Sequence, residues 1–117
     1  MDDIALVVDV LSDSTALAGV PVSTEIPATR PSRMVTVSLM GDVSAELMRR
    51  PRVMLTVWGT SDLDAHGLAV TAVHELADAA QTHDLLSHVS LESMSRDEWA
   101  ANGQARYVAQ LDLTINV

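Results

Sequence analysis

Residues His74 to Asp78, with the sequence HELAD, come close to a pattern that zinc hydrolases carry on a helix. In that pattern, His-Glu-x-x-His, two imidazoles four residues apart bind the metal and the glutamate acts as the general base. Here the fifth position is Asp78, although an imidazole and a carboxylate at this spacing can also share a metal ion. A third ligand is not evident, because His66 and His83 do not lie on the same helical face. A solvated helix surface explains these residues better, so we expect no metal site and no catalytic residues.

The other residue types that enzymes use do not form a catalytic set either. The four histidines share no common face, which favours scattered surface positions over a pH-responsive cluster. The five glycines are isolated, so no phosphate-binding loop is present. The chain contains no cysteine, which excludes disulfides and thiolate metal sites. Asp62 and Asp64 form a carboxylate pair, but capping of the helix that follows explains both. We therefore expect a protein that is not an enzyme and needs no cofactor.

One basic cluster stands out in an acidic chain. Sixteen acidic residues oppose seven basic ones, all of them arginine, and the net charge is −9. Such a chain repels phosphate overall, which argues against a general nucleic-acid binder. Arg49, Arg50 and Arg52 surround Pro51 and make a candidate docking patch for an acidic surface of a partner or another subunit. An ordinary solvated connector is the alternative explanation.

Trp99 is the second candidate interface residue. It lies in a polar loop between Arg96 and Gly103, flanked by Asp97 and Glu98. An indole in such a loop is typical of an interface anchor, and an indole that folds back over the core is the alternative. The chain has only three aromatic residues and no Phe, so a base-stacking surface is not expected.

The segment Pro51–Ala80 is the centre of the predicted fold. Val53, Leu55 and Val57 alternate with other largely apolar residues, which predicts a central strand. After Thr60 and Ser61, which are cap candidates, apolar residues recur at helical spacing. The buried stripe is predicted to contain Ala65, Leu68, Ala69, Ala72, Val73, Leu76, Ala77 and Ala80. Gly67 inside this helix suggests a close contact.

The rest of the chain supplies a first helix and four more strands. The first helix is expected near Asp2–Leu11, with Gly19 as a stop signal. Alternating or extended segments at 20–26, 34–40, 87–95 and 105–117 predict the strands, and 41–50 is a connector that fits either a helical turn or the tips of two long strands. Residues 1–117 thus predict one α+β domain in the order α-β-β-β-α-β-β, with two helices on a mostly antiparallel sheet of four to five strands. No apolar run approaches ~18 residues, so no membrane span is expected.

This order resembles that of the tail terminator, or tail completion, proteins of long-tailed bacteriophages, in particular those of actinobacterial phages. The segment 52–59, RVMLTVWG, is similar to their strand that begins with an arginine and ends in an aromatic residue. The segment 61–69, SDLDAHGLA, is similar to the polar turn and alanine-rich helix that follow it. The segment 104–113, QARYVAQLDL, is similar to their closing strand, which an arginine–tyrosine pair opens. The resemblance covers most of the chain but includes no catalytic motif.

The resemblance implies a structural role in the virion. Proteins of this family are small α+β subunits of a hexameric ring that caps the tail tube and ends its polymerisation. The implied partners are further copies of the chain, the tail tube protein and the head completion or connector protein, and DNA passes through the channel without specific binding. The expected location is the head–tail junction of the virion, and the host cytoplasm during assembly. Two alternatives remain: another neck or tail-tube ring protein, or a small cytosolic ligand-binding or regulatory oligomer.

Overall fold

The computed structural model describes residues 3–25, 31–42, 48–97 and 105–116. Two α-helices, one 3-10 helix and six strands follow one another in these segments. In chain order they are α1 (Asp3–Ser12), η1 (Thr15–Leu17), β1 (Val22–Ser23), β2 (Met34–Asp42), β3 (Met48–Arg49), β4 (Pro51–Gly59), α2 (Asp62–Ala79), β5 (Leu86–Arg96) and β6 (Ala105–Asn116). The predicted α+β class and element order are confirmed. The additions are η1 and β3, the latter lying in the stretch expected to be a connector.

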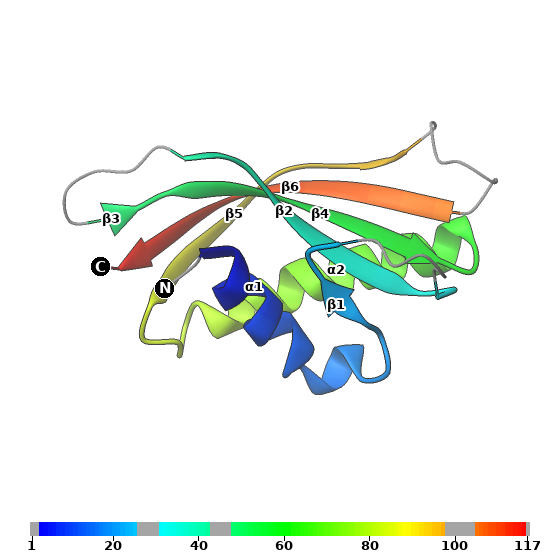
Figure 1. Ribbon diagram of the computed structural model, residues 1–117, viewed down its shortest axis with the longest axis horizontal. Coiled ribbons are helices and arrows are strands. Elements are labelled where there is room, and N and C mark those ends of the chain that lie inside the picture. Colours follow the sequence, from blue (N-terminus) through cyan, green and yellow to red (C-terminus); the bar gives the residue numbers. More distant parts are fainter. Residues whose placement is uncertain (1–2, 26–30, 43–47, 98–104, 117) are drawn as a thin grey trace.

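All six strands belong to one sheet. β2, β4 and β6 lie side by side, and β5 and the short β3 both pair with β6. Every pair is antiparallel except β1 with β2. Both α-helices lie under the same face of this twisted sheet, so none of the described helices lies on the opposite face (Figure 1). We call that opposite side the open face.

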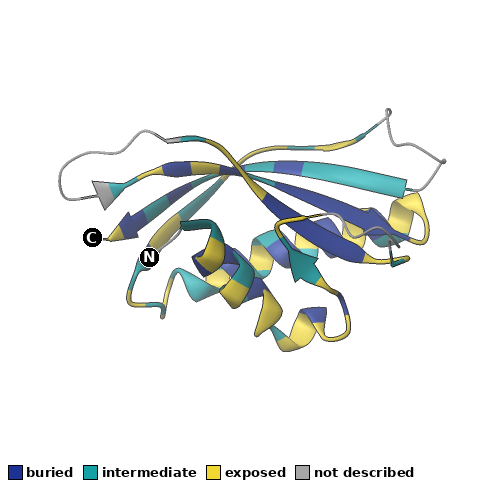
Figure 2. Ribbon diagram, in the orientation of Figure 1, coloured by how far each residue is buried: buried dark blue, intermediate teal, exposed yellow. Residues whose placement is uncertain are grey.

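The core lies between the helices and the sheet. Because strand side chains alternate, one set from each strand points toward the helices. These buried residues include Val35 and Val37 of β2, Val53, Leu55 and Val57 of β4, and Leu111, Leu113 and Ile115 of β6. The sides of α1 and α2 that face the sheet are buried, and their outer sides are exposed (Figure 2).

The alanine-rich stripe of α2 packs on the sheet as the sequence predicts. Ala65, Leu68, Ala69, Ala72 and Leu76 are buried in the core. The remaining stripe residues are only partly buried: Val73, Ala77 and Ala80. Small side chains on the contact surface allow the helix backbone to lie close to the strands. The stripe therefore decides which face of the sheet is covered.

A reciprocal cap fixes the beginning of α2. The Oγ atom of Ser61 accepts a hydrogen bond from the Asp64 N–H at 3.1 Å. The Asp64 carboxylate accepts one from the Thr60 N–H at 2.9 Å and lies 3.2 Å from the Arg33 Nε atom. This arrangement resembles a capping box, with aspartate in place of glutamate. The Thr60 N–H is the main cause of the lowered pKa of Asp64, which desolvation opposes and the positive charge of Arg33 assists.

Gly59, at the end of β4, is the glycine that a close backbone contact requires. A Cβ atom at this position would lie 2.4 Å from the Ala65 backbone nitrogen and 2.7 Å from its Cα atom. At Gly67, in contrast, a Cβ atom would meet no atom within 4 Å. The sequence-based expectation for Gly67 was therefore wrong, since the tight approach occurs where strand and helix meet. Gly19 has a φ of 81°, a conformation that favours glycine, but α1 ends at Ser12, so the expectation that Gly19 ends the first helix was wrong.

The two glycines predict opposite effects of the same substitution. Gly59→Ala should lower the free energy of unfolding by about 2 kcal/mol or more, because the backbone of Ala65 cannot yield as a flexible side chain would. Gly67→Ala should raise it by about 0.5–1 kcal/mol, because alanine favours an open helical position. Urea denaturation of the two variants checks both signs, and equal effects would contradict this account of Gly59.

The cap also predicts a dependence of stability on pH. Because the folded pKa of Asp64 lies below its ordinary value of 3.8, ionisation is favoured in the folded state. Its contribution is present above the unfolded pKa and is lost as the pH falls through the folded pKa. In Asp64→Asn, stability should therefore fall less steeply in acid than in the wild type, as followed by urea denaturation at several pH values.

Glu75→Gln provides the matched control for this prediction. It removes a carboxylate from the same helix at a residue that makes no ion pair within the described chain. This variant should keep the acid sensitivity of the wild type. Equal changes in Asp64→Asn and Glu75→Gln would show that the cap does not cause the effect.

Candidate docking surface on the open face of the sheet

The open face is built from the strand residues that point away from the helices. Register pairs Met54 with Gln110, Thr56 with Val108 and Trp58 with Arg106 on this side. The same side carries polar and charged residues of three neighbouring strands: Thr36, Ser38, Arg52, Thr56, Arg106, Asp112 and Thr114. An antiparallel sheet commonly keeps one face on the core and one toward solvent. Here that face carries paired charges and hydroxyl groups, although Thr36, Thr56 and Trp58 are themselves buried.

The alternation of side chains divides the predicted arginine cluster into two parts. Arg49 in β3 is opposite Ile115, whose side chain lies in the core, so Arg49 points to the helix side. Its Nη2 atom lies 2.8 Å from the Asp3 Oδ1 atom at the start of α1. Arg50 and Arg52 instead belong to the open face. The cluster is continuous in sequence, but Arg49 fastens a helix while the other two face outward.

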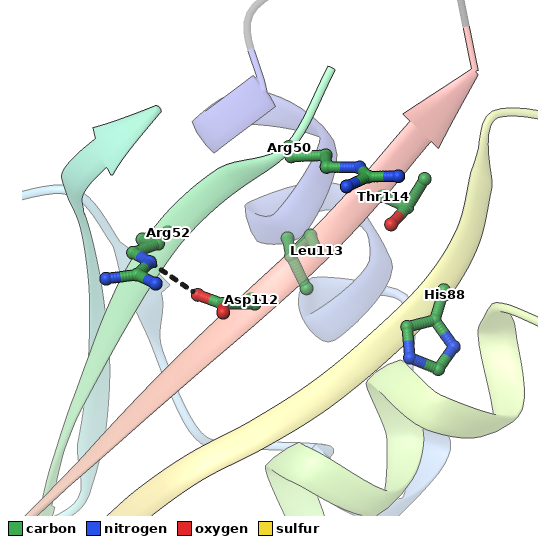
Figure 3. Close-up of a pocket in the computed structure, with 6 residues that line it drawn as sticks. All are labelled: Arg50, Arg52, His88, Asp112, Leu113 and Thr114. Atoms are coloured by element: carbon green, nitrogen blue, oxygen red, sulfur yellow. Dashed lines mark ion pairs between the residues drawn. The ribbon is translucent and has the colours of Figure 1, made fainter. Parts of the chain in front are cut away.

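A groove on the open face brings Arg50 and Arg52 together with residues of two other strands. Its volume is about 370 Å³, and it is lined by Arg50, Arg52, His88, Asp112, Leu113 and Thr114. Figure 3 shows Arg52 reaching Asp112 on β6, Arg50 reaching toward Thr114, and His88 contributed by β5. The Arg52 Nε atom lies 3.0 Å from the Asp112 Oδ1 atom. We call this feature the arginine groove.

Most arginines of the described chain already have an acidic partner. The ion pairs are Arg33–Asp64, Arg49–Asp3, Arg52–Asp112, Arg96–Asp62 and Arg106–Asp97. Arg50 is exposed and forms no ion pair within the segments that the structure describes. His88 lines the same groove. The arginine groove therefore offers an available cation on an otherwise acidic protein, which suits a carboxylate of a partner.

The other end of the open face has a different composition. A groove of about 320 Å³ is lined there by Thr24, Thr36, Ser38, Met54, Thr56, Trp58, Asp97, Arg106 and Val108. Trp58 is only 1% exposed, and the Arg106 guanidinium carbon lies 5.6 Å from the centre of its ring. Arg106 also pairs with Asp97. The arginine and the indole hold each other in place at the point where β4 and β6 end.

The histidines lie apart and have separate local contacts. The His74 Nε2 atom lies 3.4 Å from the Asp78 Oδ2 atom, one turn later on the exposed side of α2. The ring centroids of His66 and Tyr107 are 5.2 Å apart. The Nδ1 atom of His83 accepts backbone N–H groups in the turn before β5, at 3.1 and 3.3 Å. Within the described residues, no group of three or more His, Asp or Glu is placed to hold a metal ion.

The site residues named from the sequence are thus only partly brought together. Arg50 and Arg52 share the arginine groove, Arg49 lies on the other side of the sheet, and Trp99 lies outside the described residues. The sequence did not identify His88 and Thr114 as part of the site. They are opposite one another in the register of β5 and β6, and register is a property that the alternation of a single strand cannot supply.

Comparison with known proteins does not assign a family. The sequence matches no protein-family model and no curated protein. No described helix is long and apolar enough to span a bilayer.

The division of the arginines predicts different effects on folding. Arg49→Glu should lower the free energy of unfolding by about 1 kcal/mol or more, because it places a second carboxylate against the half-buried Asp3. Arg50→Glu should change it by less than about 0.5 kcal/mol, as for most exposed positions. Thermal and urea unfolding measure the free energy of unfolding of the two variants. Equal losses of stability would refute the assignment of Arg49 and Arg50 to opposite sides of the sheet.

Proposed function

We propose that this protein is a tail terminator of a long-tailed bacteriophage. Copies of the chain form a ring that caps the tail tube, ends tube polymerisation and provides the surface to which the head is joined. Under this proposal the protein is not an enzyme and works through contacts with other proteins. The proposal combines the resemblance in the segments 52–59, 61–69 and 104–113 with the shape of the subunit.

The observation that carries the proposal is the one-sided construction of the domain. Both helices cover one face of the sheet, and the other face presents the arginine groove to solvent (Figures 1 and 3). Small-molecule sites are usually concave and mostly apolar. Besides Leu113, the arginine groove is lined by charged and polar side chains, those of Arg50, Arg52, His88, Asp112 and Thr114. Such a surface suits a protein partner that brings carboxylates to Arg50.

The net charge of −9 also fits a ring through which DNA passes. A channel rich in arginine would bind phosphates and slow the passage of DNA. In this chain five of the arginines pair with aspartates, so their charges are locally neutralised. The available cation of Arg50 is then suited to a protein contact at one end of the ring.

The proposal predicts a ring that binds only the ends of tail tubes. Native mass spectrometry and electron microscopy of the purified protein should show a six-fold ring, in solution or on added tubes, and the ring should stop tube elongation. Arg50→Glu, at an exposed residue with no ion pair among the described residues, should fold normally yet weaken attachment to the tube or connector, because it reverses a charge of the arginine groove.

The double variant Gln81→Glu/Thr82→Glu is the charge-matched control, since it also adds two negative charges but in the exposed turn after α2. It should attach normally. A ring that stacks into long tubes would instead identify a tube protein. A ligand-dependent rise in melting temperature, without binding to tubes, would favour a cytosolic ligand-binding oligomer.

A further inference from the structure

The sheet ends in two strands with unpaired edges within the described chain. On the outer side of β2, β1 pairs only with Val35 and Thr36, which leaves the later part of β2 without a strand partner there. β5 pairs with β6 on one side, and no described strand lies on its other side. Such edges carry free backbone N–H and C=O groups that can pair with another strand.

One row of side chains runs across the sheet from edge to edge. Leu39 of β2 is opposite Val53 of β4, Val53 is opposite Leu111 of β6, and Leu111 is opposite Leu91 of β5. We call these four residues the leucine row. Its two central members, Val53 and Leu111, are fully buried. Its two ends are not, since Leu39 is 54% exposed and Leu91 is 46% exposed.

The exposed ends make both edges apolar at the same level of the sheet. The described chain has five large apolar residues that are exposed, and three of them lie on the edge strands: Leu39 and Met40 on β2, and Leu91 on β5. Isolated exposed leucines are common on protein surfaces. Leu39 and Leu91, however, are the two ends of one continuous row, and each lies beside an unpaired strand edge. The two leucines can therefore form the two sides of one contact between subunits.

We propose that the occupant of these edges is a second copy of the chain, with β5 of one subunit pairing with β2 of the next. Leu91 of one copy then packs against Leu39 of its neighbour, and the leucine row continues from subunit to subunit. This assignment rests on the proposed ring and identifies the surfaces that build it. Backbone hydrogen bonds supply affinity, and the leucines set the register.

The strand directions permit this contact to repeat. β2 and β4 are antiparallel, β4 and β6 are antiparallel, and β6 and β5 are antiparallel, so β2 and β5 run in opposite directions. A rotation about an axis roughly parallel to the strands preserves these directions and makes the new pair antiparallel. The two surfaces are different, so the contact is head-to-tail and generates a closed ring when the rotation closes.

Irregularities beside the leucine row restrict the contact to one register. The pairing of β2 shifts between Leu39 and Gly41, and that of β5 shifts between Leu91 and Ser93. Bulges on edge strands hinder long, uncontrolled pairing. Leu39 ends the regular run 34–39 of β2 and Leu91 ends the regular run 88–91 of β5, so a bulge beside each leucine limits how far an added strand can pair. Such a limit suits a specific subunit contact better than open-ended aggregation.

Two variants that each disable one edge test the proposal. Leu39→Lys leaves the β5 edge intact, and Leu91→Glu leaves the β2 edge intact. Each alone should be monomeric by native mass spectrometry, at concentrations at least about tenfold above those at which the wild type assembles. An equimolar mixture should form a one-to-one heterodimer and nothing larger, because only one pair of intact edges is available.

Leu63→Glu is the matched control, because Leu63 is 83% exposed on α2, away from both sheet edges. This variant should assemble as the wild type does. Circular dichroism should show that all three variants are folded.

Several outcomes would overturn the edge contact. One is a wild type that stays monomeric at its highest soluble concentration, both alone and with added tubes. Another is a ring formed by either edge variant alone. A third is a dimer of Leu39→Lys alone, which would indicate symmetric β5–β5 pairing. Wild-type rings that cap tubes and are unaffected by both substitutions would refute the edge contact and leave the proposed function intact. Heterodimers from the mixture, together with wild-type rings that never bind tubes, would support the edge contact and refute the proposed function.

Discussion

The contact between the alanine-rich stripe of α2 and the apolar faces of β4 and β6 determines the rest of the architecture. Small side chains at Ala65, Ala69 and Ala72 allow the helix to lie close to the strands, and Gly59 gives the chain room to turn into the helix. α1 packs beside it and closes the same face. Once this side of the sheet is covered, every second residue of each strand points to the other side, where Thr36, Thr56 and Trp58 are nevertheless buried. The open face follows directly from that packing.

The same alternation gives neighbouring residues different environments. Arg49 points to the helix side and pairs with Asp3, while Arg50 and Arg52 point to the open face. A half-buried ion pair holds the start of α1, and an exposed guanidinium remains available to a partner. The aspartates have a corresponding role, because five of them neutralise arginines at defined places. Some of the acidic residues thus stabilise the fold through ion pairs with arginines.

The leucine row shows how a packed core can extend to a surface. Val53 and Leu111 are buried because strands lie on both sides of them and helices lie below. Leu39 and Leu91 occupy the same row but lack a strand on one side within the described chain. Their exposure results from the end of the sheet, and a further strand at either edge would remove it. The proposed ring contact supplies such a strand at both edges with one repeated interface.

The sequence by itself determined the class of the fold and the order of its elements. Periodicity depends on neighbouring residues, so the strand of Pro51–Gly59 and the stripe of α2 could be predicted from the chain alone. The Ser61 cap could be predicted for the same reason. Trp58 was correctly placed near the end of its strand. The fold class followed from the order of these local patterns.

Only the tertiary structure decided which residues meet. Arg50 lies between β3 and β4, His88 in β5 and Thr114 in β6, and the register that sets His88 opposite Thr114 depends on pairing and bulges rather than on local pattern. The tight glycine was also misplaced from sequence, because close approach is a property of two packed elements and not of one helix. The leucine row joins residues 39, 53, 91 and 111, which no local periodicity connects. Local patterns thus specified the elements, and burial on one face of the sheet specified the surfaces.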